Sequence, residues 1–222
     1  MKRRTIMRKL LALMMSILLV FSVAACGNTP AQDGDSSDIG DGSAAQTSSD
    51  TADRPEAPEE SGNKVLVVYY SSTGHTQTVA RYIAAATGAD LFELVPSEPY
   101  TGADLNYNDN NSRVVYEHEH LEARAVELVS VTPEDWDSYD TVFIGYPIWW
   151  QIAAWPVDGF VKANDFTGKT VIPFATSASS GLGESGELLA ELAGTGDWQE
   201  GRRFSSNTGE AAVTEWLRSL GF

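Results

Sequence analysis

A short polar loop combines the residue types that bind a phosphate group. It reads Tyr70-Ser71-Ser72-Thr73-Gly74-His75-Thr76 and stands between an apolar run and a segment with helical periodicity. The N-terminus of a helix offers unpaired N–H groups and a partial positive charge, and Gly74 lets a phosphate approach the backbone closely. Ser71, Thr73 and Thr76 add hydroxyl donors. The loop has no lysine or arginine and lacks the Gly-Lys-Ser/Thr of a nucleoside-triphosphate loop, so a monophosphate held by neutral donors fits it better.

Strands and helices alternate on both sides of this loop. Apolar runs, rich in β-branched residues, predict five strands, at 64–70, 91–95, 141–145, 170–175 and, more weakly, 201–205. The spacing of apolar residues predicts helices at 75–87, 114–128, 155–162, 185–192 and 209–220. This alternation predicts an α/β fold, a doubly wound parallel sheet with helices on both faces. Ligands of such sheets bind beyond the carboxyl ends of the strands, so the loops after strands one, three and four matter most.

Those three loops resemble the loops of one known family. The Ser71-x-Thr73-Gly74-x-Thr76 pattern is similar to the FMN-phosphate loop of flavodoxins, and the resemblance covers essentially the whole folded region. Two further stretches look like flavin-flanking loops of flavodoxin-like bacterial proteins: Gly145-Tyr146-Pro147-Ile148-Trp149-Trp150 and Thr176-Ser177-Ala178-Ser179-Ser180-Gly181-Leu182-Gly183. The resemblance implies the strand order 2-1-3-4-5 and one noncovalently bound FMN. His75 departs from the asparagine that is commoner there, and Ala178 and Ser179 stand in a turn often built from glycines.

The residues expected to bind FMN come from these three loops. An indole face of Trp149 or Trp150 can stack on the isoalloxazine ring and shield it from water, although one or both could instead pack under a loop. The small residues of the third loop permit close approach, and their N–H groups could bond the pyrimidine end of the ring; a plain surface turn is the alternative. The expected set is Ser71, Ser72, Thr73, Gly74, His75, Thr76, Pro147, Ile148, Trp149, Trp150, Thr176, Ser177, Ala178, Ser179 and Gly181.

Two other patterns are interpreted as carrying no chemistry. The stretch 181–186 spells G-x-G-x-x-G, but it follows a late strand, whereas the dinucleotide-binding fingerprint follows the first strand of its unit. His118 and His120 are two residues apart in a polar stretch, a spacing that does not share a helix face. We therefore expect these histidines on a solvated surface, and we expect no metal site and no catalytic acid or base.

The N-terminus has the layout of a secretory signal. Five basic residues precede an apolar run over 10–20 and then small residues. The segment ends Val23-Ala24-Ala25-Cys26-Gly27, which resembles a bacterial lipobox and implies cleavage before Cys26 and lipidation of its sulfur. An uncleaved membrane anchor or a coincidental cysteine is the alternative, but the apolar run is shorter than the roughly 20 residues that span a bilayer. Cys26 is the only cysteine, so its lipidation would exclude disulfides and thiolate ligands from the folded part.

Composition divides the chain into three parts. Residues 1–25 are the expected lipoprotein signal peptide, and 26–62 comprise Cys26 and an acidic linker too poor in apolar residues to fold. Residues 63–222, about 160 in number, suit one flavodoxin-like domain. Without the five basic residues of the signal, ten Lys and Arg stand against thirty-one Asp and Glu, a net charge near −21. This charge argues against nucleic acid as a partner.

These observations favour an exported FMN-binding electron-transfer protein. We expect a lipid anchor to hold it on the extracytoplasmic face of the cell membrane, where it exchanges electrons with a redox partner protein or a small-molecule donor or acceptor. FMN would carry the redox chemistry and the protein would supply position and electrostatics. Two alternatives remain: an FMN-dependent reductase of quinones or other small molecules, and a flavin-free binding module that kept only the fold. Whether the protein is an enzyme stays open at this point.

Overall fold

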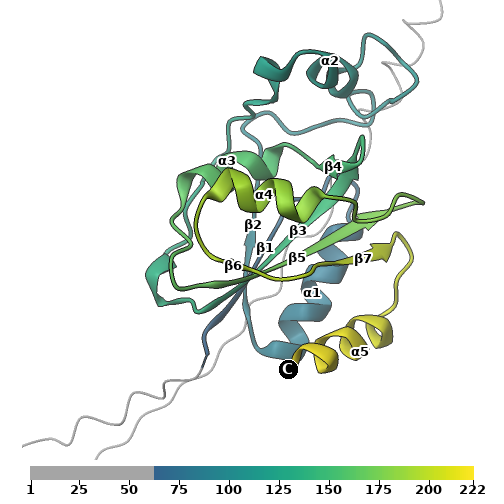
Figure 1. Cartoon of the computed structure of the whole chain (residues 1–222). Helices are drawn as coiled ribbons and strands as arrows, with labels where there is room; N and C mark the ends of the chain where they lie inside the picture. Colours follow the sequence, from purple (N-terminus) through teal and green to yellow (C-terminus); the bar gives the residue numbers. More distant parts are fainter. Residues whose placement is uncertain (1–62) are drawn as a thin grey trace, which may run out of the picture. The chain divides into compact units, whose positions relative to one another are not determined.

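Seven strands form one sheet in residues 63–222, which are the residues that this computed structural model describes. The proposed signal peptide (1–25), Cys26 and the linker (26–62) lie outside the described residues. The strands are β1 (Val65–Tyr69), β2 (Asp90–Glu93), β3 (Thr141–Trp149), β4 (Ile152–Ala153), β5 (Thr170–Ser177), β6 (Asp197–Trp198) and β7 (Arg202–Ser205) (Figure 1). All neighbouring strands are parallel except the short β4, which pairs antiparallel with β3.

The strand order confirms the predicted doubly wound topology. It runs β2-β1-β3-β5, and the position beside β5 is shared by β6 and β7. β6 pairs with the start of β5 and β7 with its end, on either side of Pro173. The carbonyl oxygen of Val171 accepts a hydrogen bond from Gln199 N–H, on the edge of β5 that faces β6 and β7. The nitrogen of Pro173, two residues further along the strand, lies on the same edge. Because proline has no N–H to donate, the ladder breaks there and the fifth strand is split.

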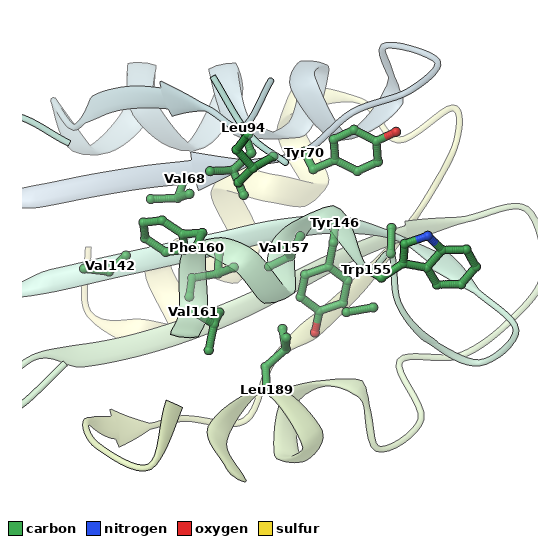
Figure 2. Close-up of a cluster of buried hydrophobic side chains, with 14 of the residues drawn as sticks. Val68, Tyr70, Leu94, Val142, Tyr146, Trp155, Val157, Phe160, Val161 and Leu189 are labelled. Carbon is green, nitrogen blue, oxygen red and sulfur yellow. The ribbon is translucent and has the colours of Figure 1, made fainter. Parts of the chain in front are cut away.

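Helices cover both faces of this sheet (Figure 1). They are α1 (His75–Thr87) and α5 (Glu210–Leu220) on one face, and α3 (Pro156–Ala163) and α4 (Ser185–Ala193) on the other. Figure 2 shows the second face, where Phe160 and Val161 of α3 and Leu189 of α4 belong to one buried cluster with Val142 of β3. Since helices pack on both sides, the central strands are continuous apolar runs, as the sequence indicated.

A long excursion, residues 96–132, connects β2 to the segment before β3 and contains a shorter helix than expected. α2 spans only Arg113–Glu119 and is followed by a 3₁₀ turn, η1 (Leu121–Arg124); a second 3₁₀ turn, η2 (Trp136–Ser138), precedes β3. The prediction of a helix over 114–128 is wrong in its second half. Arg124 folds back, and its Nε and Nη2 donate to the carbonyls of Glu117 (3.0 Å) and His118 (2.8 Å). These bonds satisfy carbonyl groups at the end of α2, which have no N–H donor within the helix.

No helix within residues 63–222 is long and apolar enough to cross a membrane.

Candidate functional site

The carboxyl ends of β1, β3 and β5 surround a cavity of about 560 Å³. It is lined by Ser72, Thr73, His75, Leu105, Tyr107, Pro147, Ile148, Trp149, Trp150, Thr176, Ser177, Ala178, Ser179, Ser180 and Ser206. Eleven of the fifteen residues expected from the sequence are in this set; the other four are Ser71, Gly74, Thr76 and Gly181. The cavity therefore lies at the edge of the sheet where doubly wound folds bind ligands, and all three predicted loops contribute to it.

The loop after β1 ends at the N-terminus of α1. Gly74 adopts a left-handed conformation (φ 86°), which glycine reaches without a side-chain clash. Its N–H donates to Ser71 Oγ (3.1 Å), so Ser71 closes the turn and does not line the cavity. The first backbone bond of the helix runs from Thr78 N–H to the Gly74 carbonyl (3.0 Å). The N–H groups of the first turn therefore precede the helical ladder, which is where a helix attracts anions.

A buried hydrogen bond joins the first loop to the third. Thr76 is 1% exposed, and its Oγ1 lies 2.8 Å from Oγ1 of Thr176 at the end of β5. At its other end the third loop approaches the β3–β4 turn, because a Cβ built on Gly183 would lie 3.3 Å from the carbonyl oxygen of Gln151. Residues 176–183 therefore extend from the first loop to the β3–β4 turn. Thr76 fixes the position of this span and is not itself in the cavity wall.

The stretch after the third predicted strand is a tight hairpin. Trp149 pairs with Ile152, so Trp150 and Gln151 form a two-residue turn between β3 and β4. Both turn residues have positive φ, 44° and 68°. Two-residue hairpins of this kind require left-handed backbone and usually contain Asn or Gly. Side chains larger than these in that conformation are uncommon, and such strain is typical of sites where a side chain is held for function.

The two tryptophans of this hairpin have different surroundings. Trp149 is 3% exposed, and its ring lies edge-on to Tyr100 (5.2 Å between ring centroids) and Trp155 (4.7 Å). Trp150 is only partly buried, and its ring is stacked on the imidazole of His118 at 4.2 Å and 13°. Both line the cavity, but Trp149 is part of the core and Trp150 is the more accessible aromatic surface.

The excursion between β2 and β3 supplies a further wall of the cavity. Leu105 and Tyr107 line it, and the ring of Tyr107 lies 5.0 Å from that of Trp150. Tyr107 is 47% exposed, and the partial burial of its hydroxyl raises its pKa to about 12. Like an ordinary tyrosine, it is neutral at physiological pH and can donate a hydrogen bond. His118 and His120 are both partly exposed, and the ring of His118 stacks on that of Trp150, a contact that the expectation of a solvated surface did not include. His120 instead stacks on Tyr116 at 4.2 Å, so the two histidines share no partner ring.

A buried carboxylate anchors this excursion to the aromatic wall. Glu117 of α2 is 4% exposed. Its Oε2 accepts from the hydroxyl of Tyr100 (2.6 Å) and from Nε1 of Trp155 (2.7 Å), and its Oε1 pairs with Nε of Arg113 (2.7 Å). Tyr100 and Trp155 are two of the rings that pack around Trp149. Glu117 therefore connects α2 to the side chains that support the β3–β4 hairpin.

Four lining residues were not expected from the sequence, and two of them carry no local signal: the four are Leu105, Tyr107, Ser180 and Ser206. Leu105 and Tyr107 lie in an irregular stretch, and nothing in their spacing says that it folds back over the sheet edge. Ser206 could have been found, because it directly follows β7, whose carboxyl end meets the same edge. Ser180 lies inside the third predicted loop.

The cavity wall is neutral although the domain is acidic. Residues 63–222 contain twenty-two Asp and Glu and nine Lys and Arg, a net charge near −13. None of the carboxylates is among the residues that line the cavity; the wall consists of hydroxyl, apolar and aromatic side chains with one histidine. Within the described part of the chain, no group of three or more His, Cys, Asp and Glu is placed to hold a metal ion. This wall suits a ligand that has both a flat apolar part and an anionic group.

The known proteins similar to this chain are flavodoxins and flavoproteins. A family model described as Flavodoxin matches residues 64–220. No curated protein matches the chain significantly. Among solved structures, the chain is similar to a candidate flavoprotein from Bacteroides eggerthii, with 39% identity and a TM-score of 0.65 over 72% of this chain and 99% of that one. A second candidate flavoprotein, from Bacteroides uniformis, is 36% identical with a TM-score of 0.65 over 71% and 99% of the two chains.

A more distant structure shares the fold. It is a flavoprotein from Lactobacillus acidophilus solved in complex with FMN, 22% identical to this chain, with a TM-score of 0.50 over 70% of this chain and 99% of that one.

Proposed function

This chain belongs to the flavodoxin family, and from that premise we propose that it binds one FMN in the cavity at the ends of β1, β3 and β5 and transfers electrons through it. The observation that carries the proposal is the convergence of three loops on one neutral cavity at this edge of the sheet. The FMN complex of the Lactobacillus acidophilus flavoprotein, which has the same fold, supports the choice of cofactor.

The residues present fit the two chemically different ends of FMN. Ser72, Thr73 and the first turn of α1 offer hydroxyl and N–H donors for the monophosphate, with no carboxylate among the lining residues to repel it. Trp150, which lines the cavity beside Tyr107 and His118, offers aromatic surface to the isoalloxazine ring. The hydroxyls and N–H groups of residues 176–180 are available to the polar edge of that ring. When bound, FMN supplies reversible uptake of one or two electrons, and the protein positions the ring and excludes water from it.

The test is an absorbance titration of the purified full chain with FMN. We expect saturable uptake of one FMN per chain, quenching of flavin fluorescence, and absorbance maxima in the near-ultraviolet and blue that dithionite removes. A protein that remains colourless and does not quench added FMN contradicts the proposal and favours a flavin-free binding module.

A reductase with its own substrate is the second candidate, and one observation favours it. Leu105 and Tyr107 come from the excursion and form a wall that none of the three flavodoxin loops supplies. With Trp150 they provide aromatic and apolar surface against which a quinone ring could lie. Rapid reduction of the FMN-loaded protein by NAD(P)H, with turnover of a quinone, supports the reductase. Reduction only by a protein donor or a chemical reductant supports the carrier.

For location, we propose a lipid anchor at Cys26 and a position on the extracytoplasmic face of the membrane. The support is the sequence alone, in the signal-like segment that ends at Cys26. Metabolic labelling with a radioactive fatty acid tests it. The full chain should be labelled and sediment with membranes, and a Cys26→Ser variant should lose the label; equal labelling of both contradicts the anchor.

A further inference from the structure

Arg203 lies outside the cavity wall and holds the third loop by hydrogen bonds. It lies on β7, opposite Ala175 of β5, and is partly buried. Its Nε donates to Ser177 Oγ (2.8 Å) and its Nη2 donates to the Ser177 carbonyl oxygen (2.8 Å). Two bonds from the planar guanidinium to one residue fix both the position and the orientation of that residue. Ser177 is itself a lining residue of the cavity, whereas Arg203 is not.

The loop that Arg203 contacts also contains backbone donors without a protein acceptor among the described residues. The Ser177 hydroxyl, which accepts from Arg203, donates in turn to the carbonyl oxygen of Ser180. Both oxygens of Ser177 and the Ser180 carbonyl therefore have partners. Within residues 63–222, the N–H groups of Ala178, Ser179 and Ser180 donate to no protein acceptor, and these three residues line the cavity. Consecutive free N–H groups of this kind bind anions and electron-rich carbonyls.

The charge of Arg203 is not neutralised by a carboxylate. In the described part of the chain the one ion pair is that of Arg113 with Glu117, and Arg203 donates instead to two neutral oxygens of Ser177. Partly buried cations are usually paired with carboxylates. Within the described residues, Arg203 has no such partner and contacts a loop whose N–H groups have no protein acceptor. This arrangement favours a ligand that carries or gains negative charge in the cavity.

We propose that Arg203 is a positioning residue that stabilises reduced FMN over oxidised FMN, acting through Ser177 and the 176–180 loop; this inference rests on the proposed function. Two electrons and one proton convert oxidised FMN into its anionic reduced form, which carries one more negative charge on the ring. A domain of net charge near −13 opposes this change. Arg203 offsets that opposition locally, by its own charge and by fixing the position of the 176–180 loop, whose N–H groups are then available to the ligand.

The test compares Arg203→Gln with Arg202→Gln in the full FMN-loaded chain. Arg202 is the neighbouring residue on β7, and its guanidinium lies 5.5 Å from the ring centroid of Phe204 on the other face of the sheet. Both variants lose one positive charge from the same strand, but only Arg203 contacts the loop. The readouts are the dissociation constant of oxidised FMN, from flavin fluorescence, and the two-electron midpoint potential, from equilibration with a redox dye. Dithionite supplies the electrons.

Arg203→Gln should weaken binding of reduced FMN relative to oxidised FMN by at least about tenfold, equivalent to a midpoint potential lower by about 30 mV. Arg202→Gln should change that ratio less than about threefold, which is about 14 mV on the same scale. Equal shifts in the two variants, or no shift in Arg203→Gln, overturn the inference while leaving FMN binding intact.

A third variant keeps the test decisive if Arg203→Gln does not fold. Arg203→Lys retains the charge but cannot make both bonds to Ser177. Arg203→Lys should lower the midpoint potential, by less than Arg203→Gln does, whereas Arg202→Lys should leave the potential unchanged. If Arg203→Gln does not fold, an unchanged potential in Arg203→Lys overturns the positioning role. A wild-type protein that takes up no FMN removes the proposed function and this inference together.

Discussion

The two adjacent tryptophans differ in burial, and their positions in the sequence do not predict this difference. Trp149 is buried among Tyr70, Tyr100 and Trp155, whereas Trp150 is partly exposed at the tip of the β3–β4 hairpin. The sequence predicted that at least one of them would meet the flavin. Because Trp150 is the less buried of the two and lines the cavity, we expect Trp150 to contact the isoalloxazine ring and Trp149 to support the cavity wall from the core.

Trp150→Ala and Trp149→Ala should therefore separate binding from stability. Trp150→Ala removes a stacking surface worth about 1–3 kcal/mol, so FMN affinity should fall about tenfold or more with little change in the free energy of unfolding. Trp149→Ala leaves a cavity in the core and should cost about 3–5 kcal/mol of stability. Urea denaturation of the FMN-free protein and FMN titration measure the two effects. The opposite assignment would show that Trp149 is the residue against the ring.

The first loop is tested by a carboxylate placed among its donors. Thr73 lines the cavity beside Gly74, so Thr73→Glu puts a negative charge where we place the phosphate, and FMN affinity should fall at least about a hundredfold. Ala86→Glu is the control: it adds the same charge in the last turn of α1, at an exposed position outside the cavity wall. Equal losses of affinity in the two variants would place the phosphate elsewhere.

At the scale of the elements, the excursion 96–132 is held by one buried carboxylate. Glu117→Gln removes the charge that Arg113, Tyr100 and Trp155 contact, and hydrogen bonds to charged groups contribute about 1.5–3 kcal/mol. We expect the free energy of unfolding in urea to fall by about 2–3 kcal/mol. Glu119→Gln, on the same helix but exposed, should change it by less than about 0.5 kcal/mol. Equal effects would mean that Glu117 does not anchor the excursion.

Helix α3 contains an acid whose ionisation opposes folding. Burial raises the pKa of Asp158 to about 6, although the charges of Lys162 and Arg124 act in the opposite direction. An acid with a raised folded-state pKa contributes stability below its unfolded pKa and loses that contribution as pH rises through the folded value. The wild type should therefore lose up to about 3 kcal/mol between about pH 4 and pH 7 that Asp158→Asn does not lose. Parallel stability profiles of the two proteins against pH would contradict this.

Local periodicity was sufficient to predict most of the elements, and it failed where tertiary contacts decide. The buried strands β1, β3 and β5 and the amphipathic helices α1, α3, α4 and α5 were predicted within a few residues, because their apolar pattern matches their burial. α2 was predicted too long, because the folding back of Arg124 onto Glu117 is a contact that no periodicity encodes. The split of the last strand position depends on Pro173, whose missing N–H matters only once β7 is placed beside it.

The site was predictable to the extent that it consists of loops at strand ends. Ligands of doubly wound sheets bind at the carboxyl ends of the strands, and from this rule the sequence predicted that Thr73, Trp150 and Thr176 would meet in one cavity. Tyr107, His118 and Arg203 were missed because their roles come from packing across the fold and not from a local motif.

At the scale of the whole molecule, net charge should influence the redox behaviour of bound FMN. Residues 63–222 carry a net charge near −13, which disfavours the additional negative charge of reduced FMN. Raising the ionic strength from about 0.01 M to about 1 M shortens the Debye length from about 30 Å to about 3 Å. The midpoint potential of the bound FMN, measured against free FMN at each salt concentration, should therefore rise with salt. A difference that stays constant would show that local groups alone set the potential.

A crystal structure of the protein grown with FMN would show directly where the cofactor binds. We predict the phosphoryl oxygens within hydrogen-bonding distance of the hydroxyl and N–H donors of residues 72–76, and the isoalloxazine ring between Trp150 and the 176–180 loop. A structure in which FMN binds elsewhere, or in which this cavity contains only water at saturating FMN, would contradict this prediction.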